Sequence, residues 1–163
     1  MLKALPEPAS TLVAVAAFTG VRKGELRGLL WENYDGEQVL LSQSYWRGHA
    51  LEPKTRQSKA PVPVIAQLAR RLDWHRGLSG NPANGLMFPS PLGKPINLDA
   101  LAADVIVPLL IKAGVQWHGW HAFRRVIGNQ SSSARGPRPD YSEDLEALRP
   151  GRYAALLYQD RGQ

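Results

Sequence analysis

An alternating stretch interrupted by prolines, in the first half of the chain, constrains the fold more than any other sequence feature. Residues 39–46 and 49–54 alternate as strands do, with a turn between them, and residues 60–64 form a third candidate strand. Because proline cannot donate a hydrogen bond to a neighbouring strand, Pro61 and Pro63 place the third strand at a sheet edge. We therefore predict a small three-stranded antiparallel sheet.

Apolar residues at helical spacing lie on both sides of this stretch. Segments 8–18 and 22–30 precede it, and segment 64–74 follows it. A further helix begins after Asn97, a residue that favours the N-cap position, and we expect Pro108 to kink or end that helix. Helical segments outnumber strands, so we predict an α+β fold that is mainly helical.

The composition limits the classes of protein to which the chain can belong. Its 163 residues correspond to one domain, and it has no cysteine, which excludes a disulfide framework and a Cys-based metal site. No apolar run approaches the length of a membrane span, and the N-terminus lacks a secretion-signal pattern. We therefore expect a cytoplasmic protein that makes no membrane contact.

The positive charge is concentrated in the larger, N-terminal part of the chain. Residues 1–125 hold 15 of the 20 Lys and Arg and 9 of the 14 Asp and Glu, so the whole net charge of +6 lies there. A basic surface favours a polyanion, because contacts with phosphates release counterions. The alternative is an ordinary solvated basic surface.

Two arginine-containing motifs lie about a hundred residues apart, each beside a predicted helix. Residues 19–26 read Thr-Gly-Val-Arg-Lys-Gly-Glu-Leu and residues 120–125 read Trp-His-Ala-Phe-Arg-Arg. Arginine grips a phosphate through two parallel N–H bonds, so Arg22 and Arg124 suggest a clamp on one phosphodiester. His121 lies three residues before Arg124 and shares its helix face. The alternative is a helix start with exposed charges.

A third segment, residues 52–64, places Pro-Lys-Thr in the hairpin and a Val-Pro strand after it. Together the three segments resemble the catalytic domain of the tyrosine recombinase (phage integrase) family, in the family's order. The alternative for Lys54 is a solvated hairpin lysine. The resemblance implies an integrase-type catalytic domain in residues 1–125, with the last helices of the family missing or altered.

The resemblance also assigns roles to individual residues. It implies that Arg22, Lys54, His121 and Arg124 are catalytic, with Lys54 as the general acid, and that Lys23, Arg56, Lys59 and Arg125 contact DNA. Glu25 would brace Arg22, and Gly20 and Gly24 fit a close approach of the backbone to DNA. Phe123 is expected in the core.

In the family, a tyrosine hydroxyl attacks the scissile phosphate and leaves a 3′-phosphotyrosyl link and a free 5′-hydroxyl. The arginines stabilise charge on the non-bridging oxygens, and the bond energy is retained in the phosphotyrosine, so the reaction needs no metal and no nucleotide cofactor. The implied partner is double-stranded DNA. Family members form tetramers on DNA, but we do not expect ordered tetramers of this chain.

The sequence departs from the family pattern after Arg124. No histidine or tryptophan follows His121, and the remaining tyrosines lack the family's surroundings, although Tyr158 is the best candidate nucleophile. The N-terminal DNA-arm domain usual in the family is also not expected here. From Asn129 onward the chain is polar and rich in breakers, so we expect a loosely ordered tail.

We hypothesise that residues 126–163 are the out-of-frame translation of an integrase gene. The shifted frame permits Tyr-Ile-Lys-Thr across residues 157–161 and a Leu-Gly-Val turn within residues 129–142. An in-frame stop, or a non-tyrosine codon across Leu157–Tyr158, would contradict the hypothesis.

The expected function is site-specific DNA recombination or integration, as in a mobile element, and defective in this chain. Two alternatives stay open. The chain could be an active recombinase that uses Tyr158, or a non-catalytic basic module that binds DNA or another partner and merely resembles the family.

Overall fold

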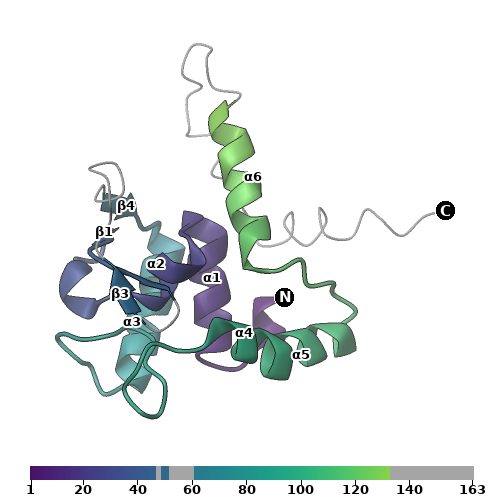
Figure 1. Cartoon of the computed structure of the whole chain (residues 1–163), viewed down its shortest axis with the longest axis horizontal. Helices are drawn as coiled ribbons and strands as arrows, with labels where there is room; N and C mark the ends of the chain where they lie inside the picture. The colour runs from purple at the N-terminus through teal and green to yellow at the C-terminus, as the bar shows by residue number, and fades with distance from the viewer. Residues whose placement is uncertain (47–48, 52–60, 133–163) are drawn as a thin grey trace.

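The computed structural model describes residues 1–46, 49–51 and 61–132 (Figure 1). The predictions that fall outside these ranges concern Lys54, Arg56, Lys59, Tyr158, the turn at positions 47–48 and residues 133–163. The described part confirms a mainly helical α+β fold with small antiparallel sheets. None of its helices is both long and apolar enough to cross a membrane.

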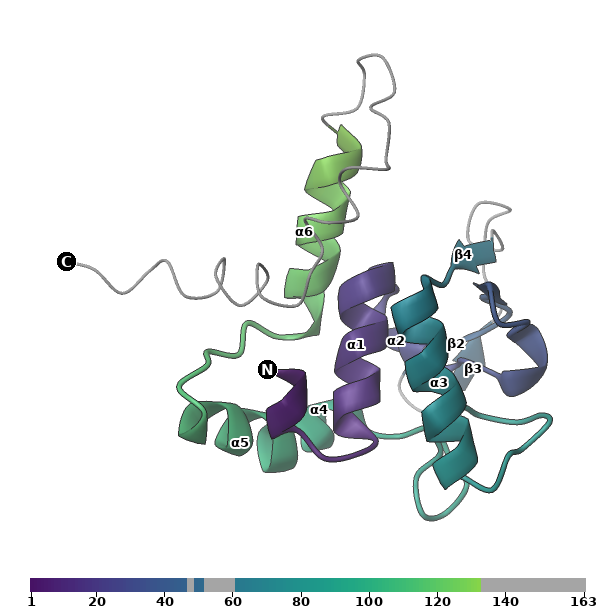
Figure 2. The ribbon, with the colours of Figure 1, turned by 180° about the vertical axis from the view of Figure 1, so that it is seen from behind.

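Helix α1 (Ala9–Thr19) lies at the centre of the molecule. Its first eight residues, Ala9–Ala16, are all buried, as expected for a helix packed on every side. Figure 2 shows α1 between α3 (Ala66–Leu78) and α6 (Trp120–Ser132), and α1 contacts both helices. A short 3-10 turn, η1 (Leu2–Ala4), precedes α1 and packs against it.

The predicted helix 22–30 is shorter than expected. Helix α2 spans Lys23–Arg27 and is followed by a 3-10 turn, η2 (Trp31–Asn33). Gly28 is the C-cap of this helix, and a side chain does not fit there: a Cβ built on Gly28 would lie 2.7 Å from the backbone oxygen of Gln43. Leu26 and Leu29, two apolar residues of the predicted helix, are buried. The segment therefore still packs into the core although its helix is shorter than predicted.

The predicted three-stranded sheet is wrong for the described residues, which form two separate two-stranded sheets. The strands are β1 (Gln38–Leu40), β2 (Ser44–Trp46), β3 (His49–Leu51) and β4 (Pro61–Pro63); β1 pairs with β4 and β2 with β3, both antiparallel. The expected strand 39–46 is interrupted because Leu41 turns into the core and the Ser42 hydroxyl accepts a hydrogen bond from Asn33 Nδ2 (2.7 Å).

A second group of helices follows a loop that buries Met87 and Phe88. Helix α4 (Leu98–Leu101) begins as predicted after Asn97, whose Oδ1 accepts hydrogen bonds from the backbone N–H groups of the second and third helical residues (3.1 and 3.3 Å). A π-helical segment, η4 (Ala102–Ile106), and α5 (Val107–Lys112) continue the same helical path. The wider π turn accommodates Pro108, which therefore does not end the helix.

Helix α6 packs its N-terminal half against α1, and its C-terminal turns extend beyond the other helices (Figure 1). It reaches Ser132, four residues into the stretch that we expected to be loose from Asn129 onward. Phe123 packs against the core as predicted, with its ring centroid 5.8 Å from that of Trp117.

Candidate functional site

The turn after α1 brings the two arginine motifs together. Arg124 Nη1 of α6 donates a hydrogen bond to the carbonyl oxygen of Gly20 (3.1 Å), across 104 positions of sequence. Gly20 lies two residues before Arg22 in the first motif. The tertiary structure therefore places the guanidinium of the second motif against the backbone of the first.

The local sequence explains why the chain turns at this point. Gly20 adopts a left-handed conformation (φ 63°), which ends α1, and its N–H donates to the carbonyl of Ala16 (3.0 Å). The Thr19 hydroxyl donates to the carbonyl of Val15 (2.5 Å) and accepts a longer bond from the Val21 N–H (3.4 Å). These bonds hold the backbone that leads into Arg22.

Gly20 and Gly24 allow other segments of the protein to come close, while the expected approach of DNA to them stays a prediction. A Cβ on Gly20 would lie 3.0 Å from Ile127 Cδ1 of α6, and a Cβ on Gly24 would lie 3.0 Å from the carbonyl oxygen of Tyr45 in β2. The space that these glycines leave open is thus filled by the protein itself. They allow α6 and the β2–β3 hairpin to approach the Arg22 motif closely.

Arg22 occupies the N-cap position of α2 and is held by Glu25, as the sequence predicted. One carboxylate oxygen of Glu25 accepts from Arg22 Nη1 (2.9 Å) and the other accepts from the Arg22 backbone N–H (2.7 Å). The Glu25 side chain is only 10% exposed, whereas that of Arg22 is 57% exposed. The Glu25 carboxylate is therefore buried and hydrogen-bonded within the protein, whereas most of the Arg22 side chain faces solvent.

His121 and Arg124 lie one helical turn apart on α6, and both are exposed. Within the described part of the chain, His121 has no hydrogen-bond or ion-pair partner. Arg125 is also exposed. Arg22, His121, Arg124 and Arg125 are thus exposed groups that are cationic or neutral, an arrangement suited to an anionic ligand.

Lys23 is bound by an acidic residue that the sequence analysis did not consider. Its Nζ lies 2.5 and 2.6 Å from the two carboxylate oxygens of Asp99, in the first turn of α4. The predicted DNA contact by Lys23 is therefore opposed by an internal ion pair. Local spacing cannot indicate this pair, because 76 positions separate its members.

Lys54 lies outside the described residues, but the hairpin that leads to it is placed. Strand β2 packs on α2, where Gly24 and Gly28 allow its backbone to approach, and the paired strand β3 ends at Leu51, three residues before Lys54. The described part of this hairpin thus rests on the helix that follows Arg22.

A second polar cluster, Glu7, Ser10, Arg71 and His75, lies between the start of α1 and α3. Glu7 Oε1 accepts from the Ser10 hydroxyl (2.5 Å) and from Arg71 Nη2 (3.3 Å), and Glu7 Oε2 lies 3.4 Å from His75 Nδ1. His75 Nε2 lies 3.0 Å from the carbonyl oxygen of Met87, and its ring stacks on Phe88. This cluster, missed from sequence, ties the N-terminal segment to α3.

The cluster is only partly satisfied: Glu7 Oε2, Thr11 Oγ1, Arg71 Nε and His75 Nδ1 are buried without a hydrogen-bond partner among the described residues. Burial alone would raise the pKa of Glu7, but the neighbouring His75, Ser10 and Thr11 side chains and the charge of Arg71 outweigh it and lower the pKa to about 2. Glu7, Ser10 and Arg71 of the cluster also line a cavity of about 300 Å³. The rest of its lining comes from Leu2, Lys3, Leu5, Pro6 and Trp74.

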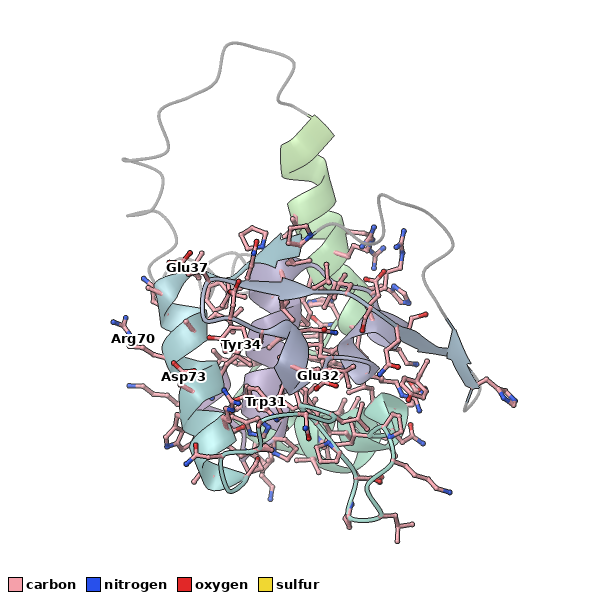
Figure 3. All side chains as sticks on the ribbon, turned by 90° about the vertical axis from the view of Figure 1, so that its left-hand side faces the viewer. Trp31, Glu32, Tyr34, Glu37, Arg70 and Asp73 are labelled. Carbon is pink, nitrogen blue, oxygen red and sulfur yellow. The ribbon has the colours of Figure 1, made fainter. Side chains whose placement is uncertain are left out.

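Another face of the molecule carries charges of both signs and no basic excess. Figure 3 shows Glu37, Arg70 and Asp73 near Tyr34 on this face. Burial and the neighbouring carboxylates of Asp73 and Asp35 raise the pKa of Tyr34 to about 12, so this phenol stays protonated. A polyanion would gain little here, which leaves the Arg22 and Arg124 region as the candidate interface.

No family model, curated protein or solved structure matches the chain.

Proposed function

We propose that this chain binds double-stranded DNA, with Arg22 and Arg124 gripping one backbone phosphate, as a partial tyrosine recombinase-type catalytic domain. The observation that supports the proposal is the hydrogen bond from Arg124 to the carbonyl oxygen of Gly20, next to the Arg22 motif. We propose further that the reaction of this domain, site-specific cleavage and rejoining of DNA through a phosphotyrosyl intermediate, is defective here.

The proposed chemistry has two parts. One is stabilisation of the phosphate and protonation of the leaving oxygen, and the other is attack by a nucleophilic tyrosine. Arg22 and Arg124 would stabilise negative charge on the non-bridging oxygens, and exposed His121 would donate a hydrogen bond to one of them. Lys54 would protonate the 5′-oxygen as the bond from phosphorus to that oxygen breaks. The new bond to phosphorus requires a positioned tyrosine hydroxyl, and Tyr158 is the best candidate.

Binding is tested by titrating a labelled DNA duplex at several salt concentrations. We expect Arg22→Ala and Arg124→Ala each to weaken binding about tenfold and to reduce the salt slope by about one, since each removes a charge-assisted phosphate contact. Arg70→Ala is the matched control, because Arg70 is an exposed arginine on the mixed-charge face (Figure 3). An equal loss in all three variants would show a diffuse basic surface and exclude the clamp.

Cleavage is tested separately with a suicide DNA substrate taken from the neighbourhood of the gene. We expect salt-sensitive binding without a denaturation-resistant protein–DNA adduct, which is the behaviour of a non-catalytic DNA-binding fragment. An adduct that disappears in Tyr158→Phe would show a working nucleophile and overturn both the proposed defect and the out-of-frame origin of the tail.

A further inference from the structure

The segment Ile96–Asp99, at the start of α4, is bound by the helix that follows Arg22. Arg27 Nε donates to the carbonyl oxygen of Ile96 (2.9 Å), and Lys23 Nζ donates to both carboxylate oxygens of Asp99 (2.5 and 2.6 Å). These bonds come from both ends of the short helix α2. They fix α2 against α4 at two points.

The same segment is bound by the helix that carries the second motif. Trp120 Nε1 donates to the carbonyl oxygen of Leu98 (3.1 Å), and both residues are buried, 7% and 0% exposed. Trp120 is the first residue of α6 and directly precedes His121. Its ring also meets that of Trp117 edge to face, at a centroid distance of 5.2 Å.

We propose that Ile96–Asp99 is a positioning bridge that sets the placement of Arg22 relative to His121 and Arg124. Three side chains, two from α2 and one from α6, hold the same four residues. Helices α2 and α6 each bind this segment through their own side chains. The bridge therefore links the two motifs by a route separate from the Arg124–Gly20 hydrogen bond. Trp120 and Asp99 are then positioning residues for the phosphate clamp.

Trp120 carries most of this effect because of its place in α6. A helix turns by about 100° per residue, so the direction of the first side chain fixes those of His121 and Arg124. The buried indole N–H has one acceptor in the described structure, the carbonyl oxygen of Leu98, and this hydrogen bond ties the first turn of α6 to the bridge. Its loss frees the first turn of α6 to rotate or shift.

The placement can be measured without DNA. The chain contains no cysteine, so Arg22→Cys and Arg125→Cys allow two spin labels to be attached at exposed positions of the two motifs. We expect Trp120→Phe, which keeps a ring but removes the N–H donor, to widen or shift the distance distribution between the labels. Trp117→Phe is the matched control. Trp117 packs against the rings of Trp120 and Phe123, but it has no hydrogen bond to the bridge.

Asp99→Asn provides a second variant that does not disturb the core, because the Asp99 side chain is 74% exposed. It removes the charge that holds Lys23, and we expect a smaller shift of the same distribution, restored by Asp99→Glu. Unchanged distributions in both Trp120→Phe and Asp99→Asn, with folding intact by circular dichroism, would overturn the proposal.

The effect of the bridge on DNA binding rests on the proposed function, and it is tested by measuring DNA affinity. In the unmodified chain Arg124→Ala should weaken binding about tenfold, and in the Trp120→Phe background we expect a loss below about threefold, because Arg124 is already misplaced. A full tenfold loss in both backgrounds would show that Trp120 is merely structural. A shifted distance distribution in a protein that binds no DNA would preserve the bridge and reject the DNA function.

Discussion

The Arg22–Arg124 region and the Glu7–His75 cluster use similar side chains for opposite purposes. In the cluster, Glu7 is surrounded by the donors Ser10, Arg71 and His75, and its pKa falls to about 2. Among the residues that the structure describes, Glu25 is the only acid bonded to the Arg22 guanidinium, and 57% of the Arg22 side chain stays exposed. Charges that are matched inside the protein stabilise the fold, whereas cations that exceed their partners are available to a ligand.

The largest expected effect concerns the buried carboxylate. Glu7→Gln should lower the free energy of unfolding by about 3 kcal/mol, because it leaves the largely buried Arg71 guanidinium without its counter-charge. Urea denaturation measures the effect as a lower midpoint. A loss below about 0.5 kcal/mol would show that the cluster contributes no more than a surface ion pair and would remove the contrast between the regions.

The same carboxylate predicts how stability depends on pH. Because the pKa of Glu7 is lowered from 4.5 to about 2 in the folded protein, the unfolded chain takes up the proton first as pH falls. Its contribution is therefore complete above about pH 4.5 and is lost between pH 4.5 and 2, by about 3 kcal/mol in total. Denaturation midpoints measured across this range should fall less steeply in Glu7→Gln than in the unmodified protein.

The junction between α1 and α6 gives an intermediate effect. Gly20→Ala should cost about 2 kcal/mol, since alanine is strained at φ 63° and its Cβ would lie 3.0 Å from Ile127 Cδ1. Gly114→Ala is the matched control: Gly114 has nearly the same φ (69°), but a Cβ there meets nothing within 4 Å. Thermal unfolding of both variants separates backbone strain from the contact with α6, and equal losses would show that the contact contributes nothing.

The smallest expected effect is on the exposed arginine. Arg22→Ala should change the free energy of unfolding by less than about 0.5 kcal/mol, because 57% of the Arg22 side chain is exposed and solvent screens its charge. Glu25→Gln should cost more, about 1 kcal/mol, since this carboxylate also accepts the Arg22 backbone N–H. Urea denaturation distinguishes the two. A larger loss for Arg22→Ala would make Arg22 a structural residue and weaken its assignment to ligand binding.

Features that depend on local chemistry were predictable from sequence. Gly20 ends α1 because only glycine adopts a left-handed conformation without strain, and Asn97 starts α4 because its side chain accepts the free N–H groups of the first turn. The bracing of Arg22 by Glu25, which the resemblance implied, likewise joins residues only three positions apart. In each case the interacting groups lie within about one helical turn.

The tertiary structure alone decided which distant segments meet. The division into two sheets depends on Leu41 entering the core and on the contact between Gln43 and Gly28. The ion pair of Lys23 with Asp99 and the bond of Arg124 to Gly20 join helices that sequence spacing cannot relate. By itself the sequence determined the local elements and the types of charge that they carry. Packing around α1 determined which of those charges are matched and which stay exposed, because long-range pairing depends on how the whole core fills.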